Sequence, residues 1–358
     1  MKTIKLSILR AARLAGLFHL FRYLTRSKVR ILCYHGGSLG DEHCFNSLLF
    51  CRADFLNDRL QWLCDKGFSI LSLESGVSLL GSDAPRPRLP TVLTFDDGWY
   101  STYKELHPVI ARHGVPATLY LCTSYFSSGQ PNPDVALSYL FWKAGGRRVV
   151  IQGIDDRLDG AHDLADKIDR GRLSSAALEW LQEGSGQGSV GEKLEMLGTQ
   201  FGVSAAELDL ASRRFSFVSQ DELLKLAAEG WSIELHGHAH HYPAGQPEVL
   251  KADLEACRVE IRNSGLPEAL HYCYPSGSFD TGAHRLLADL GVISATTCLP
   301  GLLDRADEGR RYYLSRFLDG EDIHPLEFES EMSGFSDFLR RLAGRSSPAS
   351  LCRSASSP

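Results

Sequence analysis

The amino-acid sequence predicts an α/β protein whose parallel strands form a sheet, either open or closed into a barrel. From residue 29 onward, short apolar runs alternate with amphipathic stretches, which is the pattern of strands connected by helices. The chain has 358 residues, of which 43% are hydrophobic and 23% charged, an ordinary composition for a globular protein. That length suffices for one barrel-sized domain with a core large enough to fold unaided.

The apolar runs are the predicted strands. They are short and end at polar residues or turn signals, as buried strands of a parallel sheet do. The loop RPRLP separates two of them along the chain. The predicted strands span residues 29–35, 68–73, 91–97, 117–122, 231–236, 271–275, 293–297 and 312–317.

The amphipathic stretches between these runs are the predicted helices. One of them begins with Ser219 and has Glu222 three positions later, the spacing of a capping box. Another ends at Gly67, a typical helix terminator. The predicted helices span residues 53–67, 101–114, 219–230, 246–264, 281–290 and about 325–342.

Residues 1–28 are predicted to form a basic amphipathic helix. Residues 1–30 contain eight Lys or Arg and no Asp or Glu, and the arginines interrupt any stretch resembling a signal peptide or a membrane span. Such a helix can lie on an anionic membrane or pack on the protein's own body, and an organelle transit peptide is a third interpretation. Its apolar side is formed by Leu6, Leu9, Leu14, Leu17, Phe18, Phe21 and Leu24.

The remainder of the chain is acidic. The whole chain has a net charge of −6, but beyond residue 30 there are 30 basic and 44 acidic residues, a net charge of −14. An acidic body does not favour nucleic acid as a partner. Nine cysteines form an odd set without a CxxC pair, which favours reduced thiols. We therefore expect a cytoplasmic protein, peripheral on the inner face of the membrane if residues 1–28 contact lipid.

Residues 127–217 interrupt the alternation of strands and helices. They are rich in Gly and Ser and in acidic helical stretches, and we interpret them as an insertion in one strand-to-helix loop. The main domain is then residues 29–342. The tail, residues 343–358, has few apolar side chains and is expected to be disordered.

Polar side chains end several of the predicted strands. His35 ends the first, Asp96 and Asp97 end another, His236 ends a fourth, and the segment YPSG ends a fifth. The carboxyl ends of parallel strands meet at one edge of the sheet, so these groups nominate a single site. The adjacent aspartates need compensation for their mutual repulsion, and a metal would provide it.

The segment HGHAHH supplies four histidines at positions 236, 238, 240 and 241. Histidine is the commonest metal ligand in proteins. Positions 236, 238 and 240 would share one face of a strand, whereas 236 and 240 suit one helical turn, so spacing alone leaves the ligand pair open. An Asp-His-His set would leave positions free for water and substrate in either a zinc hydrolase or an iron oxygenase.

The motifs TFDDGW, HGHAH and YPSG, in this order on an α/β chain, resemble those of the polysaccharide deacetylases with a NodB-homology domain, carbohydrate esterase family 4. The resemblance extends over about residues 29–340 apart from the insertion, through ILCYHGGS, HGVPATLYL and YLSRFLDGEDIHPLEF. It implies a distorted (β/α)7-8 TIM-like barrel with an inserted helical segment. It also implies a divalent metal, with Zn²⁺ expected and Co²⁺, Ni²⁺, Mn²⁺ or Fe²⁺ as alternatives.

The resemblance assigns roles to individual residues. Asp96 would be the general base, and Asp97, His236 and His240 the metal ligands. Water activated by the metal would attack the N-acetyl amide of an amino sugar. Gly98 would permit the turn that lets the two aspartates point in different directions.

The acid histidine of the commoner family members has no counterpart after residue 300. The segment ILCYH before the aspartates instead resembles that of the circularly permuted members, some of which act on poly-N-acetylglucosamine, so His35 is the expected general acid. The segment YPSG implies that Tyr274 and Ser276 contact substrate, Ser276 through a backbone N–H at the oxyanion. Trp99 is a candidate sugar platform or a core residue. Arg316 is a candidate for orienting the base.

Three functions remain as hypotheses at this point. The first is deacetylation of a polysaccharide or glycan precursor. The second is deformylation or another amide hydrolysis on a lipid-linked sugar, and the third is a catalytically silent glycan-binding protein. The presence of all five candidate base, acid and ligand residues disfavours the third.

Overall fold

The computed structural model describes residues 2–126, 128–183, 188–305 and 309–344, and its centre is a sheet of eight parallel strands. Seven of the predicted strands coincide with strands of this sheet, whereas the range 312–317 overlaps its strand only at Phe317. Across the sheet the order is β11 (Ser294–Thr296), β10 (His271–Cys273), β9 (Trp231–Leu235), β6 (Ala117–Leu121), β5 (Pro90–Asp97), β1 (Arg30–Tyr34) and β12 (Phe317–Leu318), with β4 (Ser69–Leu71) also paired to β5.

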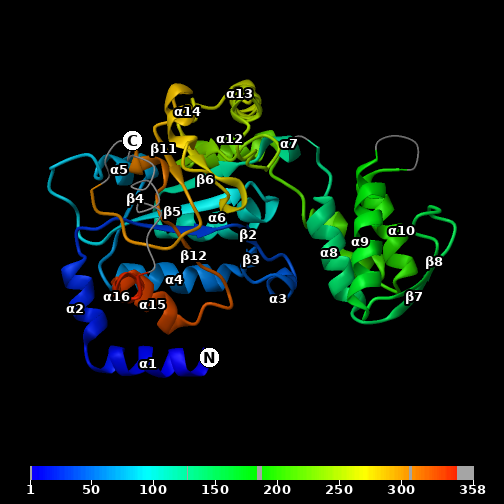
Figure 1. The fold of residues 1–358 in the computed structure, drawn as a ribbon, viewed down its shortest axis with the longest axis horizontal. Coiled ribbons are helices and arrows are strands. Elements are labelled where there is room, and N and C mark those ends of the chain that lie inside the picture. Colours follow the sequence, from blue (N-terminus) through cyan, green and yellow to red (C-terminus); the bar gives the residue numbers. More distant parts are fainter. Residues whose placement is uncertain (1, 127, 184–187, 306–308, 345–358) are drawn as a thin grey trace.

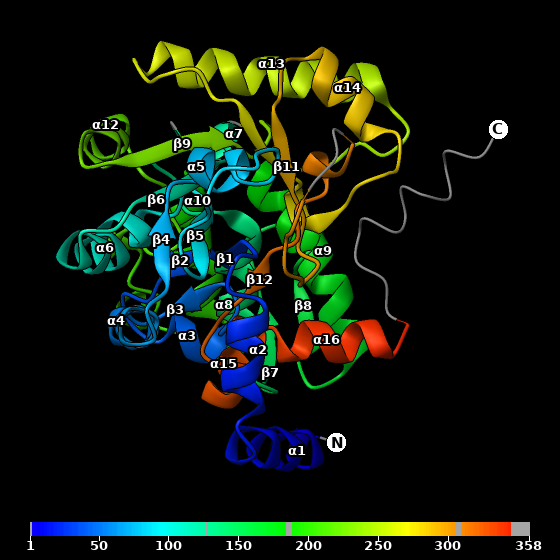
Figure 2. The same cartoon turned by 90° about the vertical axis from the view of Figure 1, so that its left-hand side faces the viewer.

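The sheet curls until its two edges are bridged. The N–H of Leu314 donates to the carbonyl of Ala295 (2.9 Å), and the N–H of Thr297 donates to the carbonyl of Leu314 (2.8 Å). Leu314 lies just before β12, so one segment pairs with β1 and also contacts β11 at the opposite edge. Helices lie on successive sides of the strands (Figure 2). The predicted distorted α/β barrel is therefore confirmed.

The central strands are buried on both faces. All eight residues of β5 are buried, including its threonines and both aspartates. Such strands read as continuous apolar runs because helices cover one face and core side chains cover the other. Buried polar groups in them need partners, and the Thr94 hydroxyl accordingly donates to the Leu32 carbonyl at 2.8 Å.

The connecting helices largely match the amphipathic stretches of the sequence. The capping box is confirmed, because the Ser219 hydroxyl and the Glu222 carboxylate each accept the other residue's backbone N–H. The prediction of one helix over 325–342 is wrong, because Gly334 has a φ of 85° and ends the first of two helices. The helices of the barrel are α3 (Glu42–Phe45), α4 (Ala53–Asp65), α5 (Leu73–Ser78), η1 (Thr102–Leu106), α6 (His107–His113), α7 (Thr123–Phe126), α12 (Gln220–Ala228), α13 (Pro247–Asn263), α14 (Ala283–Asp289), α15 (Pro325–Ser333) and α16 (Phe335–Leu342).

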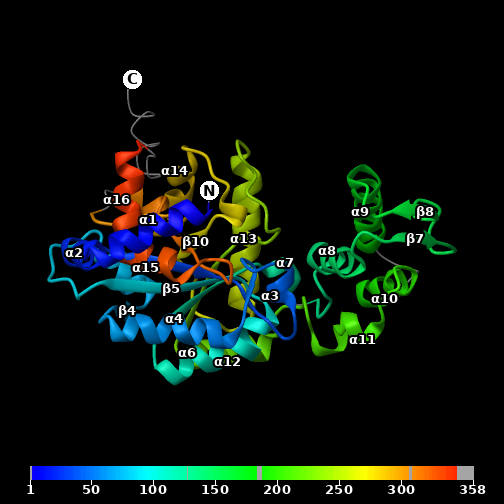
Figure 3. The ribbon, with the colours of Figure 1, turned by 90° about the horizontal axis from the view of Figure 1, so that it is seen from below.

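The segment interpreted as an insertion lies between β6 and α12 and forms a helical unit at the side of the barrel (Figures 1 and 3). Its core contains Trp180, Phe201 and Leu197, and this core continues into Phe50 and Trp99 of the barrel. The side of the barrel that bears α2 lies away from this unit (Figure 1). The elements of the unit are α8 (Pro133–Ala144), β7 (Arg148–Ile151), β8 (Gly160–Asp163), α9 (Lys167–Gln182), α10 (Val190–Gln200), α11 (Ala205–Leu208) and η2 (Leu210–Ser212).

The N-terminal segment forms two helices, α1 (Lys2–Leu14) and α2 (Leu17–Leu24), rather than one. Gly16, with a φ of 76°, separates them. Leu9 and Phe18 are buried against Leu326 and Phe335 of α15 and α16, so part of the predicted apolar side packs on the protein's own body. Within the described residues, no helix combines the length and hydropathy that crossing a membrane requires. Of the predicted disordered tail, residues 345–358 lie outside the described residues.

Candidate functional site

Polar side chains converge at the C-terminal ends of three strands. Asp96 and Asp97 end β5, His35 follows β1, and His236 follows β9. Since β1 pairs with β5 and both β5 and β9 pair with β6, parallel alignment brings these ends to one edge of the sheet. The convergence predicted from the strand ends is therefore present in the structure.

The backbone turns sharply at the second aspartate, so the two carboxylates face different partners. Asp97 has a φ of 75° and Gly98 a φ of 95°. The Gly98 N–H donates back to the Asp96 carbonyl at 3.0 Å. A Cβ on Gly98 would lie 2.5 Å from Cδ1 of Leu121, so both the conformation and the space require glycine. The left-handed conformation of Asp97 is strain of the kind that proteins retain at functional sites.

Asp96 is held by the guanidinium of Arg316 in a bidentate pair. Nη1 lies 2.7 Å from Oδ1 and Nη2 lies 2.7 Å from Oδ2. Arg316 is fully buried, and it also donates to the carbonyl of Thr297 and the hydroxyl of Thr94, both at 3.1 Å. Burial by itself would raise the pKa of Asp96, but the Arg316 charge outweighs it and holds that pKa well below its usual range. The structure thus places the candidate base against the candidate orienting arginine.

Asp97 faces the two histidines that the family resemblance pairs with it. Nε2 of His236 lies 3.2 Å and Nε2 of His240 lies 3.1 Å from the same oxygen, Oδ1. The ligand atoms of the three residues all lie within 4.8 Å of one another. Burial opposes ionisation of Asp97, but hydrogen bonds with both histidines hold its pKa well below the usual range.

Two of these side chains, His236 and Asp97, are oriented by a further group. Nδ1 of His236 lies 2.9 Å from the Cys273 carbonyl, which leaves Nε2 of that ring directed at Asp97. The indole N–H of Trp99 donates to Oδ2 of Asp97 at 2.8 Å. One carboxylate oxygen of Asp97 is therefore bound by the indole, while the other faces the two imidazoles.

The loop that carries His240 is tied to helix α13. The carboxylate of Asp253 accepts the backbone N–H of His238 (2.9 Å) and of Ala239 (2.7 Å). A Cβ on Gly237 would lie 2.7 Å from that carboxylate. His240 itself has a φ of 52°, so a second candidate ligand also has a left-handed backbone.

These residues fit a divalent cation. Asp97, His236 and His240 offer one carboxylate and two imidazole nitrogens, which are common ligands of zinc and similar metals. Asp96 also lies close to two thiols, those of Cys33 and Cys273. Both of its oxygens are, however, bound by Arg316, so this arrangement is a structural ion pair rather than a second ligand set.

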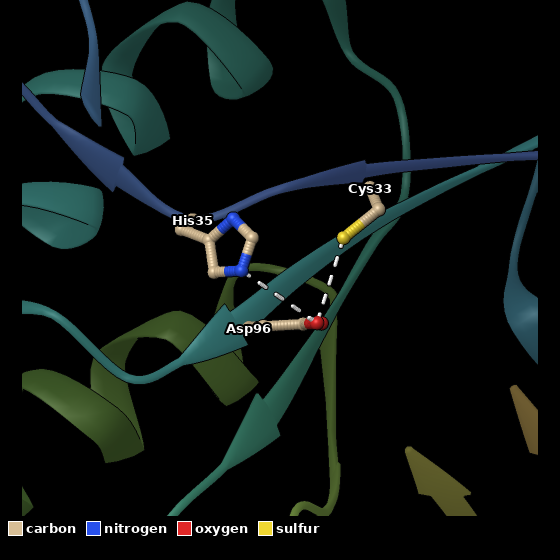
Figure 4. Close-up of side chains that lie close together, drawn as sticks. All are labelled: Cys33, His35 and Asp96. Carbon is tan, nitrogen blue, oxygen red and sulfur yellow. Dashed lines mark hydrogen bonds and ion pairs between the residues drawn. The ribbon is translucent and has the colours of Figure 1, made fainter. Parts of the chain in front are cut away.

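His35, which follows β1, points toward Asp96 (Figure 4). Its Nε2 is 4.0 Å from Oδ2 of Asp96, and the Sγ of Cys33 lies 3.5 Å from the same oxygen. The backbone of His35 is held by the Thr102 hydroxyl, which donates to its carbonyl at 2.8 Å. Among the described residues, Nδ1 of His35 is buried without a hydrogen-bond partner. The imidazole therefore approaches the candidate base, with no second group to fix its tautomer.

A cavity of about 250 Å³ adjoins the Asp97 side of the site. Asp97 and His240 line it together with Trp99, and the rest of the wall is mainly aromatic and aliphatic. Asp134 is the acidic exception, and burial raises its pKa. The wall comes partly from the insertion, so the insertion contributes to the site. The other residues that line the cavity are Leu49, Cys122, Tyr125, Asn132, Val135 and Phe217.

Two of the residues predicted to contact substrate, Tyr274 and Trp99, are buried in the protein rather than open to a substrate. The side chain of Tyr274 is fully buried among aromatic rings, and its hydroxyl donates to the Tyr312 carbonyl, so it belongs to the core. Trp99 is only 2% exposed and stacks on Phe217 with 4.6 Å between ring centroids. Because its ring is enclosed, Trp99 orients Asp97 instead of forming an open sugar platform. Ser276 is exposed, with a φ of 54°.

Sequence reasoning missed Asp253, Asp134 and the carbonyl of Cys273. Asp253 is one of several acids on a predicted helix, and Asp134 lies in the segment set aside as an insertion. No local pattern distinguishes either residue. A backbone carbonyl leaves no trace in the sequence.

A sequence model of the polysaccharide deacetylase family matches residues 83–153 and 192–294. YxkH of Bacillus subtilis (strain 168), whose name places it among polysaccharide deacetylases, is 30% identical over 95 residues. This match covers 26% of the chain and 32% of that relative, so it spans about a third of the relative's length.

Solved structures show the same fold. A Streptococcus pyogenes deacetylase, PplD, in complex with acetate superposes with a TM-score of 0.53 at 16% identity, covering 86% of this chain and 99% of that one. A de-N-acetylase from Aggregatibacter actinomycetemcomitans superposes with a TM-score of 0.51 at 13% identity, covering 85% and 99%. The matched segments contain the two aspartates and both facing histidines, so the part of the chain that carries the candidate site matches the polysaccharide deacetylase family.

Proposed function

We propose that the protein hydrolyses the N-acetyl group of an amino sugar in a polysaccharide or glycan precursor. The observation that carries the proposal is that two adjacent carboxylates have different partners. Asp96 is bound by Arg316, and Asp97 faces His236 and His240. The match to the polysaccharide deacetylase family model and the de-N-acetylase among the structural neighbours support the same reaction.

Asp97, His236 and His240 would hold the metal. The mixed carboxylate and imidazole set, in which Asp97 and His236 are buried and His240 is partly exposed, suits Zn²⁺, with Co²⁺, Ni²⁺, Mn²⁺ or Fe²⁺ as alternatives. When bound, the cation supplies Lewis-acid polarisation of the amide carbonyl and lowers the pKa of water. The hydrogen bond from Trp99 and the His236–Cys273 contact keep Asp97 and His236 aligned for it.

The remaining steps belong to the chain's own residues. Asp96, ionised beside Arg316, accepts a proton from the attacking water. His35, whose Nε2 lies 4.0 Å from Asp96, donates a proton to the leaving amine nitrogen. The backbone N–H of Ser276 stabilises the oxyanion.

A lipid-linked amino sugar is the second candidate substrate, and deformylation the second candidate reaction. Exposed apolar residues on α1 and α2, including Ile8, Leu14 and Leu24, favour peripheral membrane contact through residues 1–28. We place the protein in the cytoplasm, on the inner face of the membrane, as part of this proposal. The abundance of cysteines without a CxxC pair is consistent with that compartment.

The test measures bound metal and acetate release from an N-acetylglucosamine oligomer. Asp97→Ala and His236→Ala should each lose both, whereas His241→Ala, at an exposed position, should keep both. Full activity in the Asp97 and His236 variants would contradict the proposed site. Formate release from an N-formyl sugar that exceeds acetate release from its N-acetyl counterpart would favour the second reaction.

A further inference from the structure

Exposed large apolar side chains are concentrated on three helices. The described residues contain 17 such side chains, and nine of them lie on α1, α2 and α16. Scattered single exposed apolar residues are normal on soluble proteins, but a cluster of this kind marks an interaction site. We call this cluster the outer helical face. It consists of Ile4, Ile8, Leu14, Leu20, Tyr23, Leu24, Phe338, Leu339 and Leu342.

Helix α1 is apolar on two sides, and only one of them packs on the protein. Leu9 and Ala12 are buried against the body. Ile4 and Ile8 are 67% and 56% exposed and share a face one turn apart. Lys5 and Arg13 pair with Glu327 and Glu329 of α15, at 2.5 and 3.0 Å, and these pairs turn the Ile4–Ile8 side outward.

Helices α2 and α16 extend the same surface. On α2, Leu20, Tyr23 and Leu24 follow the i, i+3, i+4 spacing of one face and are 47%, 60% and 56% exposed. Phe21 joins the two helices, because its ring centroid lies 4.8 Å from that of Phe338. Figures 1 and 2 show α16 beside α2 at the end of the molecule that carries α1.

Basic side chains lie beside this face. Residues 1–30 contain eight Lys or Arg and no acid. Lys5, Arg13 and Arg22 pair with acids of α15, and Arg30 is buried, so the positive charge beside this face comes from the remaining basic residues. Arg10 is exposed on α1, and the Arg26 guanidinium lies 4.4 Å from the centroid of the Tyr23 ring. Arg26 also lines a cavity of about 420 Å³ with Arg86, Arg88 and Arg305, against two acids, Asp83 and Asp304.

We propose that the outer helical face docks on the surface of an anionic phospholipid bilayer. Exposed leucine, isoleucine and tyrosine side chains flanked by arginine and lysine are what such a surface binds. A second copy of the chain fits poorly, because a two-fold contact would bring the basic N-terminal segments together. The membrane contact proposed for residues 1–28 would thus be made by the outer helical face, which also includes α16. The proposal rests on that contact and on no step of the deacetylation chemistry.

Sedimentation of the full chain with vesicles tests the inference. We expect binding to vesicles of phosphatidylcholine mixed with phosphatidylglycerol, weaker binding to phosphatidylcholine alone, and loss of binding at high salt. The double variant Ile8→Glu/Leu24→Glu should bind at least about 10-fold more weakly, because it places two charges in the contact. Leu342→Glu should weaken binding if α16 takes part.

The matched control is Leu224→Glu/Val249→Glu, which adds the same two charges at exposed apolar positions on α12 and α13. It should bind vesicles as the wild type does, and both double variants should release acetate from a soluble oligomer at the wild-type rate. Equal binding by the two double variants would overturn the proposal. So would the absence of binding to anionic vesicles, or a wild-type dimer in sedimentation velocity that Ile8→Glu/Leu24→Glu abolishes. If the wild type binds anionic vesicles but releases no acetate, the result counts against the proposed reaction and not against the surface.

Discussion

The indole N–H of Trp99 lies 2.8 Å from Oδ2 of Asp97, while the Nε2 atoms of two histidines lie near the other oxygen, Oδ1. The carboxylate is thus fixed from one side by a residue only two positions along the chain. Trp99 is in turn enclosed by Phe50 and Phe217. Its orientation therefore depends on packing by side chains that are not themselves candidate ligands.

Trp99→Phe should weaken metal binding while the protein remains folded. Phenylalanine keeps most of the contact with Phe217 but cannot donate to Asp97. We expect metal affinity to fall by about 10- to 100-fold, the usual effect of removing a group that orients a ligand. Competition with a chelating indicator measures it. Phe50→Leu trims the same aromatic cluster without touching a ligand, and an equal loss of affinity in that variant would assign the effect to packing.

Arg316→Met should cost both stability and catalysis. It leaves the Asp96 carboxylate buried without its charge partner, which typically costs about 3–5 kcal/mol of unfolding free energy. Burial then raises the pKa of Asp96, so the base is protonated at neutral pH and kcat/KM falls. Urea denaturation and acetate release measure the two effects. Arg340→Met, which breaks the partly exposed pair with Glu331, is the control and should change stability by less than about 1 kcal/mol.

His35→Gln should separate the acid step from metal binding. An amide needs its leaving nitrogen protonated, so release of acetate from an amino sugar should fall by about 10²- to 10⁴-fold. Hydrolysis of 4-nitrophenyl acetate should fall much less, because nitrophenolate leaves without a proton. Bound metal should be unchanged. A parallel loss on both substrates would remove His35 from the role of acid.

Glu234→Gln should change how stability depends on pH. Glu234 is buried and accepts the N–H groups of Leu270 and His271, both at 2.8 Å, and burial raises its pKa to about 7. The folded state holds this proton more tightly than the unfolded state does, whose pKa is about 4.5. The stabilisation from protonation is therefore complete below about pH 4.5 and is lost as the pH rises through about 7.

The wild type should therefore lose about 3 kcal/mol of unfolding free energy relative to Glu234→Gln between about pH 4.5 and pH 8. Urea denaturation at both pH values gives the difference. Glu255→Gln, at an exposed position of α13, should shift stability equally at both. If the difference in unfolding free energy between the wild type and Glu234→Gln is the same at both pH values, the raised pKa of Glu234 is contradicted.

The strands and the polar residues at their ends could be predicted because their signals are local. β5 reads as an apolar run because it is buried on both faces, the aspartates end it, and His236 follows β9 directly. His240 lies further along the loop, and only the family resemblance pairs it with His236 as a candidate ligand. The break at Gly334 is visible in the sequence only as a glycine. Its φ of 85° separates α15 from α16, and the contact of α16 with α2 through Phe338 and Phe21 is not visible in the sequence.

The partners of the site residues come from distant parts of the chain and are harder to predict. Arg316, which the sequence offered only as a candidate, meets Asp96 across 220 residues, whereas Asp253, which reaches the histidine loop from a helix with several other acids, was not predicted. Tyr274 was assigned to the site from its motif, although its ring turns into the aromatic core. Direction of a side chain at a strand end depends on the local twist, and a one-residue pattern does not specify it.

The core of the insertion runs without a break into Phe50 and Trp99, and this makes the insertion an integral part of the protein rather than a removable module. Truncating residues 133–208 would remove Tyr139, which packs on Phe215, and so loosen the aromatic cluster around Phe50 and Trp99 that fixes the donor of Asp97. Conversely, loading the metal should slow amide hydrogen exchange in α9 and α10, although no residue of either helix lines the cavity beside the ligands. The metal affinity of the candidate ligands and the free energy of local unfolding of the helical unit would then be coupled, so that a change in one changes the other.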